Sequence, residues 1–404
     1  MTPAEADLPP IISVDDHIIE PRDLWLRELP ASMRERGPHV VRERVRLDFK
    51  GGKLLLERDA PDGKWCDLWC FEELVTPTML LHAAAGIESE HGADVPAVYD
   101  DFRPAAYDQA ERLRDMDTNH VEVSICYPNT FPRFAGQGFA ERTDRDLGLA
   151  SLELYNDWMI EEWCGGAGRG RLVPLTLVPL WDPDLAAAEV RRCAAKGSYA
   201  IAFTENPAKL GFPSLHSGKW DPLWEACTET GTVVSMHIGS SSVMPTTSDD
   251  APLAVSMSLN AQNAQGSVCD WVFSRTLERF PEIKLAYAES QAGWMPFLFE
   301  RMDGVWHEGV GGVELPNPPS SYAKGRIYGC IFDDEHALRS RDEIGMQHLL
   351  FESDYPHANG TWPRTRAVAH RLCEAAGMDA VDCARLLRRN AVECYGLERF
   401  GIAA

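Results

Sequence analysis

The chain has 404 residues, of which 45% are hydrophobic and 25% charged, and its formal net charge at pH 7 is −23. This composition is typical of a globular protein with a large core. The length suits either two domains or one α/β barrel with insertions. A strongly negative surface repels phosphate backbones and anionic lipid, so we expect neither a nucleic-acid partner nor a membrane partner.

The N-terminal residues and the cysteines indicate a cytoplasmic protein. The opening stretch, MTPAEADLPP, has neither the basic nor the apolar region of a signal peptide. No apolar run is long enough to span a bilayer. The cysteines number eleven, an odd count, and they lack the spacing of a disulfide framework, which predicts reduced thiols.

Short apolar runs alternate with amphipathic segments along most of the chain. The runs are rich in Val, Ile, Leu and Tyr, as buried parallel strands are. They cover residues 10–17, 120–129, 172–179, 199–207, 232–239, 284–290, 326–332 and 348–356. Helix-like segments lie between them, among them 104–117, 143–163, 182–197 and 221–231. Eight strand–helix repeats predict a single (β/α)8 TIM barrel over residues 1–404 rather than an open sheet.

One interval is longer than a single connecting helix needs, and we interpret residues 21–103 as an insertion after the first strand. Within it, residues 39–59 alternate apolar and polar side chains around Gly51-Gly52, which predicts a β-hairpin. In a barrel this connection lies on the catalytic face, so the insert either caps the pocket or decorates the periphery.

Polar residues gather at the carboxyl ends of the predicted strands. These are Asp15, His17 and Glu20 on the first strand, His237 on the fifth, Glu289 on the sixth and Asp354 on the eighth. In a barrel these ends converge on one face. Asp15 and His17 are two residues apart, so their side chains point the same way in a strand. Each residue alone is a weak signal, but together the nitrogen and oxygen donors predict a divalent metal, with zinc favoured over manganese or iron.

The segments "SVDDHIIEP", "DPLWEACTETGTVVSMHIGSSS", "KLAYAESQAGWMPFLFERMD" and "LLFESDYPHANGTWP" resemble the amidohydrolase-related (amidohydrolase 2) family. The similarity is to the branch of aminocarboxymuconate-semialdehyde decarboxylase. It implies a metal-dependent barrel that hydrolyses its substrate or decarboxylates an aromatic or muconate-like acid, usually as a homodimer. It also implies the metal ligands, which fall on Asp15, His17, His237 and Asp354. The histidine that the branch carries on strand six falls on Ser290 or Glu289 here.

From this ligand set we predict roles for the polar residues at the strand ends and in the loops. Asp354 and Glu289 are the candidate catalytic acid/base groups, and Glu20 supports the ligands from behind. Candidate substrate contacts are Asn129 and Arg133 after strand two, His216 after strand four and His357 after strand eight. A surface turn is an equal alternative for each of the two histidines. We interpret Glu352 as a structural residue paired with a base.

Three function classes remain open. The first is a hydrolase that acts on an amide, ester or carbon–carbon bond of a small, carboxylated or aromatic substrate. The second is a non-oxidative decarboxylase, and the third is a ligand-binding barrel without catalysis. Decarboxylation needs a proton donor to carbon, usually the strand-six histidine that is absent here, so the sequence favours hydrolysis.

Overall fold

A closed barrel of eight parallel strands forms the body of the molecule. The computed structural model describes residues 2–50, 53–87, 95–312 and 314–404. The strands are β1 (Ile11–His17), β6 (Val121–Tyr127), β7 (Leu172–Pro174), β8 (Thr176–Leu177), β9 (Ala200–Phe203), β10 (Val233–His237), β11 (Leu285–Ala288), β12 (Ile327–Ile331) and β13 (Leu349–Phe351). Only Leu175 separates β7 from β8, so these two segments together count as one of the eight barrel strands. The predicted (β/α)8 barrel is confirmed.

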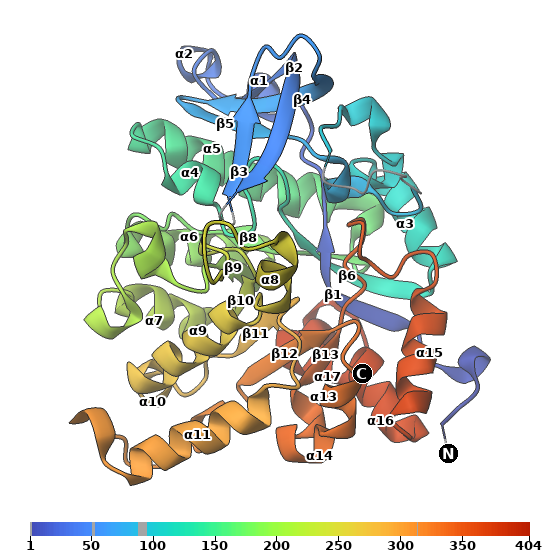
Figure 1. Cartoon of the computed structure of the whole chain (residues 1–404), viewed down its shortest axis with the longest axis vertical. Helices are drawn as coiled ribbons and strands as arrows, with labels where there is room; N and C mark the ends of the chain where they lie inside the picture. The colour runs from blue at the N-terminus through green and yellow to red at the C-terminus, as the bar shows by residue number, and fades with distance from the viewer. Residues whose placement is uncertain (1, 51–52, 88–94, 313) are drawn as a thin grey trace.

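Helices that follow the barrel strands surround them, whereas the first two helices of the chain lie in the insertion at the top of Figure 1. The helices are α1 (Leu24–Glu28), α2 (Ala31–Arg34), α3 (Gln109–Thr118), α4 (Gln137–Ala140), α5 (Arg145–Trp158), α6 (Pro183–Lys196), α7 (Asp221–Thr230), α8 (Leu253–Ser258), α9 (Gln262–Phe273), α10 (Thr276–Arg279), α11 (Met295–His307), α12 (Pro319–Ala323), α13 (Glu335–Arg339), α14 (Arg341–Ile344), α15 (Thr365–Ala375), α16 (Ala380–Ala384) and α17 (Asn390–Tyr395). Helix α6 shows why these boundaries arise: the Asp182 carboxylate accepts hydrogen bonds from two first-turn amides, and Gly197 ends the helix at φ 103°. Within the described ranges, no helix has the length and apolar character that crossing a bilayer requires.

The barrel closes between its first and last strands through a short set of polar contacts. Asp16 and Tyr355 form a parallel bridge, and the amide of His17 donates to the carbonyl of Tyr355 at 2.6 Å. The buried carboxylate of Asp16 accepts hydrogen bonds from Ser13 Oγ (2.9 Å), Ser353 Oγ (2.5 Å) and the Tyr355 amide (3.0 Å). One side chain of β1 therefore holds the turn that contains Asp354.

The insertion contains a four-stranded antiparallel sheet, ordered β3-β2-β4-β5, which lies at the top of Figure 1. Its strands are β2 (His39–Lys50), β3 (Lys53–Glu57), β4 (Lys64–Phe71) and β5 (Leu74–Pro77). The β2–β3 pairing confirms the predicted hairpin, whose turn at Gly51-Gly52 lies outside the described residues. The chain after β5 reaches the barrel, where the Ala85 amide donates to the carbonyl of Pro356 at 2.9 Å. The insert thus touches the loop that follows β13.

We predict that Asp16→Ala destabilises the closed barrel. The substitution leaves the Ser353 hydroxyl and the Tyr355 amide buried without an acceptor, so the free energy of unfolding should fall by about 3 kcal/mol. Denaturant unfolding measures this change. Asp249→Ala, at an exposed position, is the control and should leave stability unchanged. Equal stability of both variants would contradict the role given to Asp16.

Candidate metal centre

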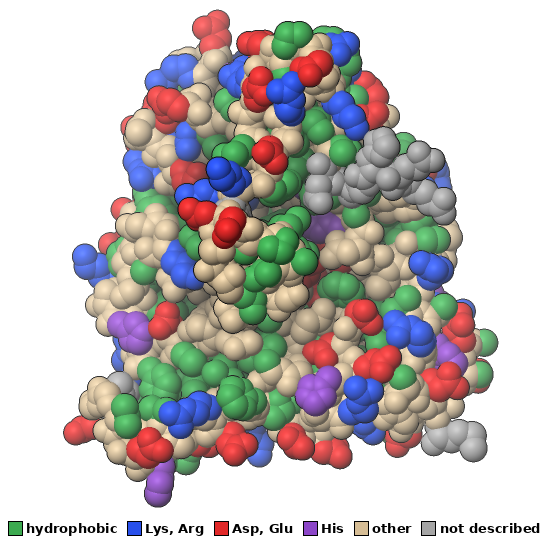
Figure 2. Space-filling view, in the orientation of Figure 1, with side chains coloured by type: hydrophobic (Ala, Val, Ile, Leu, Met, Phe, Trp, Pro, Cys, Tyr) green, Lys and Arg blue, Asp and Glu red, His purple; other side chains and the backbone are tan. Residues whose placement is uncertain are grey.

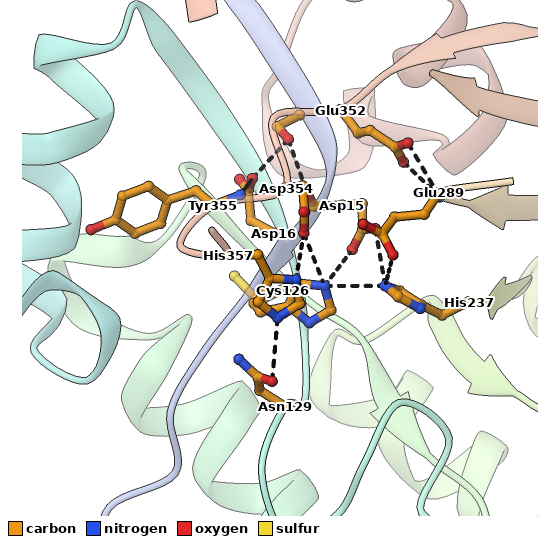
Figure 3. A network of polar contacts seen from close by, with 12 residues as sticks. Asp15, Asp16, Cys126, Asn129, His237, Glu289, Glu352, Asp354, Tyr355 and His357 are labelled. Carbon is orange, nitrogen blue, oxygen red and sulfur yellow. Dashed lines mark hydrogen bonds and ion pairs between the residues drawn. The ribbon is translucent and has the colours of Figure 1, made fainter. Parts of the chain in front are cut away.

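Ionisable side chains from four separate strands meet at the carboxyl ends of the barrel (Figure 3). Asp15 and His17 come from β1 and His237 from β10, while Glu289 follows β11 and Asp354 and His357 follow β13. All are nearly inaccessible, and Glu289 (9%) and His357 (6%) are the most exposed. Figure 2 shows histidine surface within a recess below the sheet of the insert.

The distances between these groups are those of a compact cluster. Nε2 of His17 and Nε2 of His237 are 3.2 Å apart. Asp15 lies between them: its Oδ1 is 3.3 Å from Nε2 of His17, and its Oδ2 is 3.3 Å from Nε2 of His237. Asp354 Oδ1 is 3.5 Å from Nε2 of His17. The possible ligand atoms form two triads, each within 4.8 Å, that share His17: one adds Asp15 and His237, and the other adds Asp354 and His357.

The outer nitrogens of His17 and His237 fix the orientation of both rings. Nδ1 of His17 is 3.2 Å from the carbonyl of Pro128, and Nδ1 of His237 is 2.7 Å from the carbonyl of Ile238. Since a carbonyl oxygen only accepts, each Nδ1 carries the proton. Each Nε2 then directs a lone pair into the cluster, as in histidines that bind metals.

Glu20 supports this arrangement from behind the cluster. Its buried carboxylate accepts hydrogen bonds from the backbone amides of Asn129 (3.0 Å) and Thr130 (3.2 Å), and from the Thr130 hydroxyl. These bonds hold the loop whose Pro128 carbonyl orients His17. This location agrees with the supporting role that the sequence suggests.

The carboxylates of Asp15 and Asp354 fit a bound cation. All four of their oxygens are buried, and no donor in the described part of the chain hydrogen-bonds to them. A buried carboxylate without a donor is costly unless a cation compensates its charge. Two imidazoles and two carboxylates are also suitable ligands for zinc, manganese or iron. The residues present therefore fit a divalent metal ion.

The pKa values of the cluster reflect this crowding of negative charge. Burial, followed by the charge of Asp15, raises the pKa of Asp354 well above its ordinary value. Burial and the charge of Asp354 raise the pKa of Glu289 to about 8. Burial alone would lower the pKa of His237, but the adjacent Asp15 carboxylate outweighs it and raises this pKa to about 10. A divalent cation among these groups would instead stabilise ionised carboxylates and neutral imidazoles.

The strand-six position is taken by Glu289, and Ser290 faces elsewhere. The Ser290 hydroxyl donates to the carbonyl of Tyr287 at 2.9 Å, whereas Glu289 Oε2 is 3.6 Å from Nε2 of His237. Both oxygens of Glu352 lie 3.2 Å from the Glu289 amide, which donates to them. The partner of Glu352 is therefore this amide and not the basic group that the sequence predicts. Glu289 and Asp354 both have φ 53°, a strained conformation that is common at active sites.

The predicted substrate contacts separate in the structure. His357 lies in the cluster, with Nδ1 2.7 Å from Asp354 Oδ1, and its ring stacks on His17. Asn129 lies beside it, with Oδ1 3.3 Å from Nε2 of His357. The guanidinium of Arg133 donates to Glu141 and to Ser242, and neither of these belongs to the cluster. His216 is not brought to the cluster, because its imidazole is half-exposed and pairs with Asp270 of α9 at 2.9 Å.

Two further residues at the site have no clear signal in the sequence. Phe134 stacks on His237 with ring centroids 3.9 Å apart, and only its place in the loop after strand two could have suggested it. His82 belongs to the insert, and its carbonyl accepts a hydrogen bond from Asn129 Nδ2 at 2.9 Å. Burial and the neighbouring His357 lower the pKa of His82 to about 3.

A parallel barrel with imidazoles and carboxylates converging at its strand ends defines the class of metal-dependent barrel enzymes. The sequence model described as amidohydrolase matches residues 66–397, and the chain belongs to the amidohydrolase family. Members of this family are metal-dependent hydrolases or decarboxylases, as the resemblance in the sequence implies.

Solved structures share the fold at low sequence identity. The amidohydrolase map2389c of Mycobacterium avium subsp. paratuberculosis K-10 has 20% identity and a TM-score of 0.68, with 96% of this chain and 99% of that chain covered. The 5-carboxyvanillate decarboxylase LigW of Sphingomonas paucimobilis has 20% identity and a TM-score of 0.57, covering 72% and 84%. A dihydroxybenzoic acid decarboxylase of Polaromonas sp. JS666, with bound manganese and the inhibitor 2-nitroresorcinol, has 14% identity and a TM-score of 0.60, covering 97% and 98%.

We predict that His237→Ala removes the metal and leaves the fold intact. Wild-type protein purified without chelator should carry about one divalent ion per chain, and the variant a small fraction of that. Elemental analysis measures the content, and circular dichroism checks folding. His216→Ala, distant from the cluster, should retain the wild-type content. A full complement of metal in the His237 variant would remove this histidine from the site.

Proposed function

We propose that this protein is a metal-dependent hydrolase that acts on an amide, ester or carbon–carbon bond of a small carboxylated or aromatic substrate. The observation that supports this proposal is the position of Asp354. Its carboxylate is buried, accepts no hydrogen bond from the described chain and lies 3.5 Å from Nε2 of His17. A carboxylate beside the candidate ligands is where hydrolysis requires a proton acceptor.

The ion would be held by Asp15, His17, His237 and Asp354. We favour zinc because the set combines two imidazoles with two carboxylates, and manganese or iron are the alternatives. The manganese bound to the Polaromonas enzyme supports a divalent ion in this fold without selecting among them. When bound, the ion supplies Lewis-acid activation of a water molecule and of a substrate carbonyl.

Two acidic side chains of the cluster would each carry one of the two proton transfers. Asp354 accepts a proton from the attacking water, since both of its oxygens are free of other donors. Glu289 lies across the cluster at 3.6 Å from His237, in position to give a proton to the leaving group. The Glu352 carboxylate, which holds the amide of Glu289, keeps that side chain turned toward the site.

Substrate recognition falls to the rim of the cluster and to the insert. We propose that residues 21–103 form a cap within a single-domain protein, which is supported by the contact of Ala85 with Pro356. Arg133 is the candidate anchor for a substrate carboxylate, since its side chain is partly exposed near Phe134. Asn129 and His357 lie closer to the cluster, and Asn129 is held by the insert.

The wider setting that the sequence suggests is a cytoplasmic homodimer. The eleven cysteines are free and mostly buried, which supports a reducing compartment. Phe297 of α11 is 73% exposed, which supports a contact with a second copy of the chain.

A decarboxylase is the second candidate. Two of the structures that share the fold act as decarboxylases of aromatic acids by their descriptions. Glu289 would then supply the proton to carbon in place of the strand-six histidine. A binding protein without catalysis is disfavoured, because each ligand position holds a competent donor.

A substrate panel separates the candidates. Metal-loaded protein is incubated with aromatic acids, their amides and esters, and lactones, while released CO₂ and cleaved products are followed. We expect hydrolysis products without CO₂. Release of CO₂ from an aromatic acid would establish the decarboxylase instead. Addition of a chelator should abolish turnover in either case, and this tests the need for metal.

We predict that Glu289→Gln lowers kcat by about 100-fold or more, because the amide cannot transfer a proton. Metal content should stay at the wild-type level, since Glu289 is not a proposed ligand. Steady-state kinetics and elemental analysis measure the two quantities. Glu300→Gln, exposed on α11, is the matched control. If the Glu289 variant keeps the full rate, its acid/base role is wrong.

A further inference from the structure

Glu205 is a buried acid near the cluster that the proposed mechanism does not use. It comes shortly after β9 and is 1% exposed. Its Oε1 is buried and accepts no hydrogen bond in the described part of the chain, and its Oε2 is 3.5 Å from the Ser241 hydroxyl. A buried carboxylate with so few donors costs free energy, so stability alone does not account for an acid at this position.

Glu205 and its neighbour Thr204 hold the turn that follows β10. The Glu205 amide donates to the Ser240 hydroxyl at 2.9 Å, and the Thr204 hydroxyl donates to the Ser240 carbonyl at 2.9 Å. The side chain of Gln137 donates to the same carbonyl at 2.9 Å. This turn begins at His237, whose carbonyl accepts a hydrogen bond from the Ser240 amide at 3.2 Å. The end of β9 is therefore fastened to the turn that follows a candidate metal ligand.

One peptide group of this turn lies between His237 and Glu205. Its carbonyl, that of Ile238, is 2.7 Å from Nδ1 of His237, and its N–H is that of Gly239. The group is trans, so its C=O and N–H point in opposite directions. Burial raises the pKa of Glu205 to about 7, while the charges of His237 and Lys209 and a hydrogen bond from the Gly239 amide lower it. The Glu205 carboxylate thus lies at the N–H end of the peptide group that holds His237.

His17 has the same arrangement behind its ring. Its Nδ1 is 3.2 Å from the carbonyl of Pro128, and the N–H of that peptide group, which belongs to Asn129, donates to the Glu20 carboxylate at 3.0 Å. Each candidate ligand is therefore followed by one peptide group and then by one buried glutamate. An oxygen acceptor behind a ligating imidazole fixes the ring and raises its basicity. Hydrogen bonds in a chain also polarise one another, so a carboxylate at the far end strengthens this effect.

We propose that Glu205 is a positioning residue for His237, the counterpart of Glu20 behind His17. This inference rests on the metal-dependent function proposed above. The Glu205 carboxylate orients the peptide group that follows Ile238, and the carbonyl of that group holds the His237 ring with Nε2 toward the cluster. Because the carboxylate attracts the N–H of the peptide group, its carbonyl becomes a stronger acceptor and His237 a stronger ligand. Loss of the carboxylate weakens the metal site without removing any ligand.

Zinc affinity tests this proposal. Metal-free wild type, Glu205→Ala, Glu205→Gln and Glu189→Gln are each titrated with Zn²⁺ against a chromophoric chelator, and circular dichroism checks their folding. Glu205→Ala should weaken the Kd by about 10- to 100-fold, the usual cost of losing a partner behind a ligand. Glu205→Gln keeps an acceptor oxygen but loses the charge, so its Kd should fall between that of Glu205→Ala and that of the wild type. Glu189 is a buried acid of α6 that pairs with Arg192, and its variant is the matched control with a wild-type Kd.

Proton NMR of the Co²⁺-loaded protein observes the two histidines separately. The Nδ1–H of a cobalt-bound imidazole gives a paramagnetically shifted resonance that depends on the hydrogen bond it makes. Glu205→Gln should move the resonance of His237 alone, and Glu20→Gln should move that of His17 alone. Unmoved resonances in Glu205→Gln, or a wild-type Kd in Glu205→Ala, would overturn the proposal, because the carboxylate would then not act through His237. A wild type that binds no metal would instead refute the proposed function itself.

Discussion

The fold of this protein places carboxylate charge where the protein offers it no hydrogen-bond donor. Four oxygens of Asp15 and Asp354 are buried at the barrel mouth without a donor from the described residues. Such groups cost several kcal/mol each in an apolar interior unless a cation offsets them. The Asp15 carboxylate raises the pKa of His237 to about 10, so one imidazole can carry part of the compensating charge, but one positive charge does not balance two carboxylates. The cluster therefore suits a divalent cation.

Barrel closure and assembly of the centre depend on the same residues. Asp15, Asp16 and His17 are consecutive in β1, and they alternate between the two tasks because side chains alternate along a strand. Asp15 and His17 point into the cluster, while Asp16 holds the turn on either side of Asp354. That turn has φ 53° at Asp354, so the closing contacts also maintain a strained backbone. The run of charges at the end of β1 thus has a separate use for each residue.

The strand ends that carry the candidate ligands could be predicted from the sequence, but the groups that orient those ligands could not. Apolar runs locate the strands, and parallel strands in a barrel bring their carboxyl ends together, which is enough to gather Asp15, His17, His237, Glu289 and Asp354. The bonds to the carbonyls of Pro128 and His82 and from the amide of Glu289 involve backbone groups, which every residue has, so no residue type indicates them. The prediction that His216 contacts substrate was not supported for the same reason. A position in the loop after a strand does not determine where the side chain points, and His216 points to Asp270 of α9. In the insert, the Gly-Gly turn revealed one hairpin, but the turn between β4 and β5 is Glu72-Glu73, which contains no glycine, proline or asparagine to indicate it.

The insert contacts residues beside the candidate metal centre. Its His82 carbonyl accepts a hydrogen bond from Asn129 Nδ2 at 2.9 Å, and Asn129 Oδ1 is 3.3 Å from Nε2 of His357. Nδ1 of that histidine is 2.7 Å from Asp354 Oδ1. Polar contacts therefore run without a break from the insert to Asp354, so the packing of the insert at residue 82 is connected through two side chains with the position of a candidate ligand.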